Sequence, residues 1–249
     1  MPANPASNAA STIYYMDSSG VQRFASNAYV GTWSNRNDQF ATGIGYSSSR
    51  EIYRLSLNSI DVLGFSGQIT RTISDTRFQA LAAIAIDSTQ RKYVVDIGLP
   101  GNLTPTIHVL DASDQYVTGF ALHYSTQQTR DARLVIAPDG NLILSIYFGS
   151  IANEGYVKKL RPADASEIWS KSYSGSQADP VSEIGVDSAG RIYALRSQMD
   201  VLDASGNVIS SFPFPSDGTR PRSNAPMVGV GSILYAYFRG TVYGFTMEP

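Results

Sequence analysis

The sequence predicts an all-β chain built from a repeated four-stranded unit, and three observations support this fold class. Helix signals are nearly missing, because no window of a dozen residues carries apolar positions at helical spacing without a Gly, Pro or Ser-rich break. Short β-rich runs recur instead, separated by turn residues. These runs are self-similar, and copies of one phrase start at residues 44, 84, 135, 184 and 228 of the 249.

The first phrase is an aliphatic strand that ends in a polar turn and is followed by an aliphatic-aromatic strand. Its clearest copy is 184–193, IGVDSAGRIY. Further copies lie at 84–95 and 135–144, and weaker ones at 44–53 and 228–235. Asp, Ser, Gly and Asn dominate the turns because they tolerate a positive φ or bond locally to the backbone. Each copy therefore predicts two antiparallel strands joined by a short turn.

A second phrase follows the first and adds two more strands. Its copies are 200–209, 61–69 and 108–117, with a looser version at 157–169. Four strands in roughly 45 residues are typical of one blade of a β-propeller. In the second strand of the unit, Ile192 and Ala194 face one way while Tyr193 and Leu195 face the other. A strand that is apolar on both faces is expected where it is pressed between neighbouring blades.

We therefore expect a single β-propeller over 12–249, preceded by an extended N-terminal arm at 1–11. Four blades are expected at 41–74, 80–122, 131–173 and 181–212. A fifth has three strands near 226–230, 232–238 and 241–246. The outer strand of the fifth blade is expected from the segment ending at Phe24, which closes the ring and leaves strand 12–17 over. Five blades are therefore favoured, and six blades are the alternative, since 27–40 can hold another strand.

The unit at 184–210 resembles the NHL-type and related bacterial β-propeller repeats, which read as an aliphatic-Ala-Val-Asp strand, a Gly-containing turn and then Ile-Tyr-Val. The match covers most of 41–246. Blade three departs from it, with Pro138 in place of the strand-ending Asp, and blade five shortens the turn to Gly231-Ser232. The resemblance implies the fold. It leaves function open among scaffolds, adhesins, ligand-binding modules, lactonases and quinone-dependent dehydrogenases.

Composition excludes several kinds of chemistry. The chain has no Cys and two His, so thiol nucleophiles, disulfides, Cys-ligated metals and a three-His metal centre are excluded within one chain. A net charge of −2 gives no basic surface for nucleic acid. No apolar run reaches membrane-spanning length, and 1–11 lacks the features of a secretory signal. We expect no membrane insertion, and a virion or the cell exterior is the favoured location.

Loop lengths predict where a binding surface lies. The turns that join first to second and third to fourth strands are short, whereas the connections at the other end of each blade are long, at 98–105, 122–132, 149–155, 173–181 and 213–226. Long loops on a rigid scaffold commonly carry binding. The candidate binding residues on this long-loop face are polar: Asn102, Gln127, Gln128, Arg130, Asn153, Glu154, Arg220, Arg222 and Asn224.

No catalytic, cofactor or metal site is predicted. The sequence lacks an esterase elbow, a phosphate-binding loop and a calcium loop. One Asp per repeat ends a strand, and we expect these to form turns rather than ligate metal: Asp87, Asp111, Asp187 and Asp203. His108 lies within a strand, and a Ser-His-Asp arrangement through His123 is left open. Trp169 is expected to pack between blades, while stacking of Trp33 on a sugar is left open.

The favoured function is therefore a non-enzymatic binding or structural module in a larger surface assembly, such as a phage virion, in an attachment or decoration role. Its partner is expected to be a protein of that assembly, reached through 1–11. One alternative is a lectin-like propeller with a glycan on the long-loop face. The other is a lactonase-type propeller hydrolase, which requires a divalent metal near the central channel.

Overall fold

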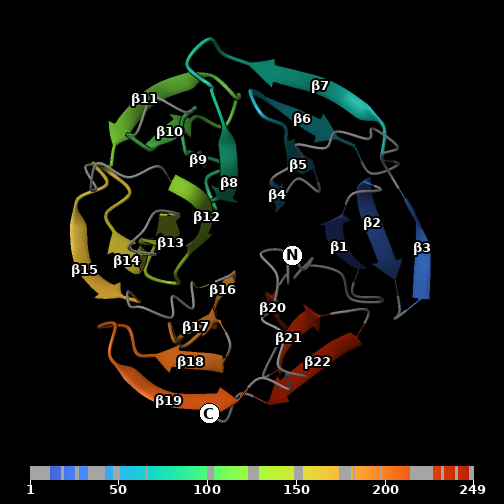
Figure 1. Ribbon diagram of the computed structural model, residues 1–249. Coiled ribbons are helices and arrows are strands. Elements are labelled where there is room, and N and C mark those ends of the chain that lie inside the picture. Colours follow the sequence, from blue (N-terminus) through green and yellow to red (C-terminus); the bar gives the residue numbers. More distant parts are fainter. Residues whose placement is uncertain are drawn as a thin grey trace. The chain divides into compact units, whose positions relative to one another are not determined.

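The computed structural model contains strands throughout its described residues and no helix among them (Figure 1). The structure describes residues 12–17, 20–25, 28–32, 43–46, 51–64, 67–99, 104–122, 129–148, 154–173, 181, 183–196, 198–213, 227–230, 233–238 and 241–246. Side chains are described only between 51 and 212. No helix of this described part is long and apolar enough to cross a membrane.

Four sheets of four strands confirm the repeated unit. Each sheet is a meander in which the strands follow one another in sequence order. Their limits agree within two residues with the four expected blades. The strands are β4 (Gly43–Tyr46), β5 (Ile52–Leu55), β6 (Ser59–Leu63) and β7 (Ile69–Ser74); β8 (Leu81–Ile86), β9 (Lys92–Asp96), β10 (Thr106–Leu110) and β11 (Tyr116–Ala121); β12 (Thr129–Ile136), β13 (Leu142–Phe148), β14 (Glu154–Leu160) and β15 (Glu167–Ser172); and β16 (Glu183–Val186), β17 (Ile192–Leu195), β18 (Gln198–Leu202) and β19 (Val208–Pro213).

Two further sheets have three strands each. The C-terminal one contains the expected β20 (Met227–Val230), β21 (Ile233–Phe238) and β22 (Thr241–Thr246). The N-terminal one contains β1 (Thr12–Asp17), β2 (Gly20–Ala25) and β3 (Ala28–Thr32), in the order β1-β2-β3. The described strands thus form six sheets, in agreement with the six-bladed alternative.

The expected closure by the segment ending at Phe24 is corrected by this pairing. That segment is β2, which is the central strand of its sheet and pairs with β1 on one side and β3 on the other. A central strand has no free edge to offer to β22. The reason is the additional strand β3 in the segment 27–40. Closure of a ring by another strand, and the arm at 1–11, which lies outside the described residues, stay predictions.

The chain divides into two compact units. The first comprises Met1–Asp96 and His108–Gly119, and the second Ile97–Ile107 and Phe120–Pro249. The second unit holds β12–β15, β16–β19 and β20–β22. Within it the first strands of consecutive sheets lie side by side, β12 with β16 and β16 with β20.

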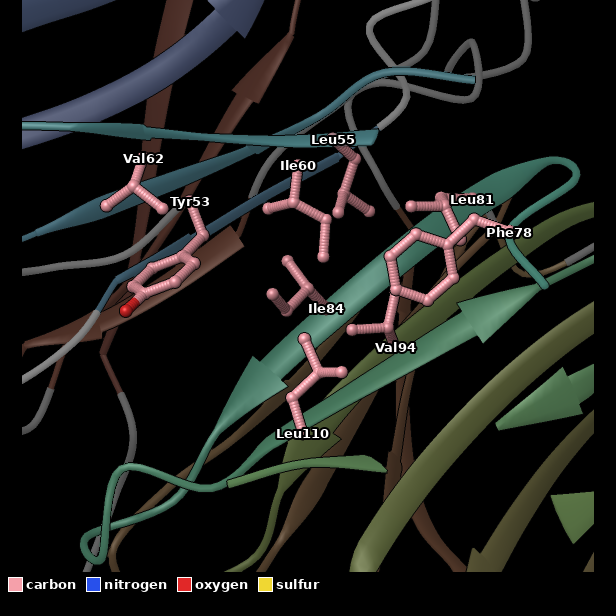
Figure 2. Packing of buried hydrophobic residues seen from close by; sticks show 9 residues of the cluster. All are labelled: Tyr53, Leu55, Ile60, Val62, Phe78, Leu81, Ile84, Val94 and Leu110. Carbon is pink, nitrogen blue, oxygen red and sulfur yellow. The ribbon is translucent and has the colours of Figure 1, made fainter. Parts of the chain in front are cut away.

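Strands that are apolar on both faces explain the core. All four residues of β17 are buried, as predicted, and so are all residues of β5 and β9. In the first unit, one cluster joins β5 and β6 to the following sheet (Figure 2). Figure 2 shows its side chains gathered between the two groups of strands: Tyr53, Leu55, Ile60, Val62, Phe78, Leu81, Ile84, Val94 and Leu110.

A second cluster lies in the second unit between the sheets β12–β15 and β16–β19. Ile143 and Val157 of one sheet pack with Ile184 and Ala194 of the other. Trp169 of β15 packs against this cluster and donates a hydrogen bond from Nε1 to the carbonyl oxygen of Ala204 at 2.9 Å. The expected packing of Trp169 between blades is thereby confirmed, whereas Trp33 lies outside the described residues.

Candidate binding site

The short-turn ends of the sheets are built on a recurring carboxylate. Oδ1 of Asp87 accepts hydrogen bonds from the backbone N–H of Thr89 and Arg91 at 2.8 and 2.9 Å. Asp111, Asp187 and Asp203 do the same two and four residues ahead. These bonds confirm the turn-forming role that the sequence predicts. Among the described residues, no group of three or more His, Asp or Glu could hold a metal ion.

The third strand of each four-stranded sheet has a buried polar position, which the sequence did not predict. It is occupied by Asp61, His108, Lys158 and Asp200, all of which are buried. Its partners lie on neighbouring strands: Asp61 accepts a hydrogen bond from Thr72, Asp200 from Ser211, and Lys158 donates to Glu167. Because each group is paired with a neighbour in its own sheet, these contacts stabilise the sheet.

His108 belongs to this core position. Its Nε2 lies 3.4 Å from Asp96 Oδ2, and its ring packs against Phe78 and Tyr116 at centroid distances of 5.3 and 5.8 Å. Asp96 also accepts hydrogen bonds from the backbone N–H of Gln79 and Ala80, so it holds the chain that enters β8. His123, the other histidine, lies outside the described residues.

The nine residues predicted for the long-loop face are only partly covered. Glu154 is the first residue of β14, and its Oε2 accepts a hydrogen bond from Tyr156 at 3.4 Å. Arg130 lies in β12, where its backbone alone is described. The others lie outside the described residues: Asn102, Gln127, Gln128, Asn153, Arg220, Arg222 and Asn224.

One row across the sheet β12–β15 departs from the repeat. Arg133 of β12 pairs with Ser145 of β13, Ser145 with Val157 of β14, and Val157 with Lys171 of β15. Cross-strand partners share a face of a sheet, so these four side chains form a single row. We call this set, Arg133, Ser145, Val157 and Lys171, the polar row.

From the second to the fourth strand, the same row is apolar in the sheets β4–β7 and β16–β19, whereas its first-strand member in β16–β19 is Glu183. In β4–β7 it reads Leu55, Ile60 and Ile73 along the second, third and fourth strands. In β16–β19 it reads Leu195, Met199 and Phe212. Ser145 and Lys171 thus stand where both other sheets place large apolar side chains. This difference between the sheets is visible only once the strand register is known.

The inner end of the polar row carries an ion cluster. Arg133 Nε lies 3.1 Å from Glu183 Oε2 on β16, and Arg133 also bonds Asp131 at 2.5 Å. Burial raises the pKa of Glu183 and of Asp131, and the opposing effect of Arg133 reduces that shift without reversing it. The neighbouring Ser145 hydroxyl donates to the carbonyl oxygen of Val181 at 3.4 Å, which ties the row to the next sheet.

The outer end of the polar row carries two cations beside an aromatic ring. Lys171 Nζ lies 5.8 Å from the ring centroid of Tyr173, and Arg196 Cζ lies 5.5 Å from it. Arg196 Nε bonds Asp200 Oδ2 at 2.9 Å. The buried hydroxyl of Tyr173 has no hydrogen-bond partner among the residues that the structure describes. Burial raises the pKa of Tyr173, and nearby Asp200 raises it further, so this hydroxyl keeps its proton.

Both ends of the row lie away from the Asp-capped turns. Asp131 and Glu183 are near the starts of first strands, while Tyr173 and Arg196 directly follow β15 and β17. In a meander these positions share the end at which the sequence predicts the long connections. At that end, a mostly buried serine, paired charges and the ammonium of Lys171, which has no ion pair among the described residues, can bind a polar ligand through hydrogen bonds and charge.

Comparison with solved structures shows the fold alone. A gluconolactonase from Xanthomonas campestris is 12% identical, with a TM-score of 0.66 over 95% of this chain and 82% of that one. The WD40 domain of Pan2 from Neurospora crassa is 12% identical, with a TM-score of 0.64 over 99% and 76%. A virginiamycin B lyase from Staphylococcus aureus, in a structure with quinupristin, is 11% identical, with a TM-score of 0.65 over 94% and 76%.

These similarities, together with the repeated four-stranded meanders, establish that the chain has a β-propeller fold. No protein-family model and no curated protein matches it. Membership of the NHL family in particular is therefore not confirmed, and the chain is placed among β-propellers by architecture alone.

Proposed function

We propose that the protein is a non-enzymatic β-propeller binding module whose ligand is held at the polar row. The observation that carries this proposal is the replacement of apolar side chains by Ser145 and Lys171 in a single sheet. The equivalent Leu55 and Leu195 are fully buried. Burial of such a leucine contributes about 1.5–3 kcal/mol. A chain that gives up this stability at one row, and keeps it elsewhere, is expected to use that row for function.

The setting of the row also favours binding. Its members lie on central and edge strands of a packed sheet rather than on loops, and Ser145 is only 3% exposed. Side chains fixed in this way lose little conformational freedom when a ligand binds. The opposite end of this sheet carries the short turns at 137–141 and 161–166.

The experiment is a thermal-shift screen of the purified protein against a panel of monosaccharides, oligosaccharides, amino acids and small carboxylic acids. Hits are repeated on the variant Ser145→Ala/Lys171→Ile, in which Ile matches Ile73 of the sister sheet. Arg161→Gln is the control, because it removes one positive charge in the turn after β14, at the opposite end of the same sheet. The proposal expects hits that the row variant loses and the control keeps. Hits that survive in the row variant would refute it.

Assembly into a larger particle, such as a phage virion, extends this proposal as a prediction. It expects native protein to sediment in a particle together with a second protein, whereas native protein sedimenting alone at about 27 kDa would contradict it.

The glycan and lactonase alternatives are separated by chemistry. Saccharide hits in the screen favour the first. Turnover of a gluconolactone that depends on added divalent metal would favour the second and would overturn the non-enzymatic assignment.

A further inference from the structure

We infer that Lys171 and Arg196 form a subsite for a carboxylate group of the ligand, with Tyr173 as the residue that positions the two cations. This inference rests on the proposed function, because the subsite is the outer end of the polar row. It names the chemical class that the row recognises.

Lys171 is exceptional among the lysines. The chain has four. Lys92 is paired with Asp114 at 2.5 Å, Lys158 with Glu167 at 2.7 Å and Lys159 with Asp139 at 2.7 Å. Lys171 is partly buried in β15 and has no ion pair among the described residues; its contact is the ring of Tyr173. An ammonium without a counter-charge among the described residues favours an anion.

Arg196 lies near the same Tyr173 ring and is held in place by Asp200. Asp200 is 3% exposed and bonds Arg196, and it also accepts hydrogen bonds from Ser211 at 2.6 Å and from Gln198 at 2.7 Å. Because Ser211 and Gln198 fix this carboxylate, the guanidinium of Arg196 that it orients is fixed too. The Tyr173 ring, bordered by Arg196 and Lys171, sets the spacing of the two cations.

Charge balance selects the ligand class. Arg196 is paired with Asp200, and Lys171 has no ion pair among the described residues, so Lys171 contributes one positive charge that is not balanced there. A single carboxylate neutralises it, whereas a phosphate dianion leaves an excess negative charge near Asp200. Guanidinium and ammonium groups together bind a carboxylate through short, charge-assisted hydrogen bonds.

The test is a calorimetric titration of the full chain with glucuronic acid, its neutral counterpart glucose, and N-acetylalanine, which has a single carboxylate and no sugar ring. We expect glucuronic acid to bind and glucose to bind at least about tenfold more weakly, since a charge-assisted hydrogen bond accounts for a factor of that order. Lys171→Gln should weaken glucuronic acid binding by about tenfold or more. Lys171→Arg should restore it, and Arg161→Gln should leave it unchanged. The thermal unfolding of each variant is recorded to confirm that it folds.

The outcomes separate the inference from the function that it rests on. Binding of glucose as tightly as glucuronic acid, with loss in the row variant, overturns the carboxylate subsite and leaves the binding module standing. Equal affinity of Lys171→Gln and the parent protein overturns the subsite as well, as does absence of binding by both acids. N-acetylalanine binding with the same dependence on Lys171 supports recognition of the carboxylate itself, and binding restricted to glucuronic acid supports an acidic sugar.

Discussion

Replacement of Gly206 by alanine probes the contact that holds the sheets of the polar row against each other. Gly206 has φ of +85° in the β18–β19 turn, and an added Cβ would lie 2.7 Å from Cε3 and 2.8 Å from Cδ2 of Trp169 in the neighbouring sheet. The alanine therefore meets backbone strain and a ring that must move. Movement of the ring also disturbs the bond from Trp169 Nε1 to Ala204.

The expected loss in the free energy of unfolding is the sum of three contributions. Left-handed backbone at a non-glycine residue costs roughly 1–2 kcal/mol, loss of the partly exposed hydrogen bond about 0.5–1 kcal/mol, and overpacking against the ring about 1 kcal/mol or more. We expect Gly206→Ala to lower the free energy of unfolding by about 3 kcal/mol. Gly190→Ala is the matched control, because Gly190 has φ of +81° with nothing within 4 Å of the added Cβ. It should cost about 1–2 kcal/mol.

Equilibrium unfolding in urea, followed by tryptophan fluorescence, measures both values. The emission of Trp169 should also change in the folded Gly206→Ala protein and stay unchanged in Gly190→Ala. Equal destabilisation by the two substitutions, with no change of emission, would refute the docking of the β18–β19 turn on Trp169.

Three further predictions concern buried polar groups. Arg54→Met leaves the fully buried Asp61 without its ion-pair partner and should lower the free energy of unfolding by about 3–5 kcal/mol. The double variant Arg54→Met/Asp61→Leu should recover most of this loss. Unfolding in urea that finds the two variants equally unstable would contradict this prediction. Burial acts to raise the pKa of Asp200, but hydrogen bonds from Ser211, Arg196 and Gln198 outweigh it and lower the pKa below its ordinary value. The contribution of Asp200 to stability is then fully present above the pKa of about 4 that an aspartate has in the unfolded chain. It is lost as the pH falls through the lower pKa of the folded state. The difference in Tm between the parent protein and Asp200→Asn should therefore narrow from pH 6 to pH 2. Ser145→Ala/Lys171→Ile should change the free energy of unfolding by no more than about 1 kcal/mol. The reason is that it exchanges a 3.4 Å hydrogen bond, and a charge with no ion pair among the described residues, for side chains that suit an apolar row. A loss of several kcal/mol, measured by unfolding in urea, would show that the row is structural.

Much of the fold could be predicted because each unit repeats its own local signals. The turn-forming Asp187 and the apolar strand Ile192–Leu195 are only a few residues apart. The sequence alone therefore indicates two strands and the turn between them. The strand β3 was less visible, because Ala28–Thr32 is short and contains Gly31. Its presence then changed the pairing of β2.

The polar row was harder to predict for a different reason. Arg133, Ser145 and Lys171 are far apart in the sequence, and each resembles an ordinary half-exposed strand residue. Only the register of β12–β15 brings them into one row and shows that Ile73 and Phe212 occupy the same position elsewhere. The buried Lys158 and Lys159 show the same difficulty, since their partners Glu167 and Asp139 lie on another strand and in a turn.

The most direct test of the account maps the ligand onto the molecule. Chemical shifts of backbone amides and of the Lys171 side chain are followed by NMR during titration with glucuronic acid. The account predicts saturable changes at Ser145, Lys171, Tyr173 and Arg196, with none at the Asp-capped turns 187–191 and 203–207. Changes confined to those turns, with Lys171 unaffected, would contradict the assignment of the polar row as the binding site.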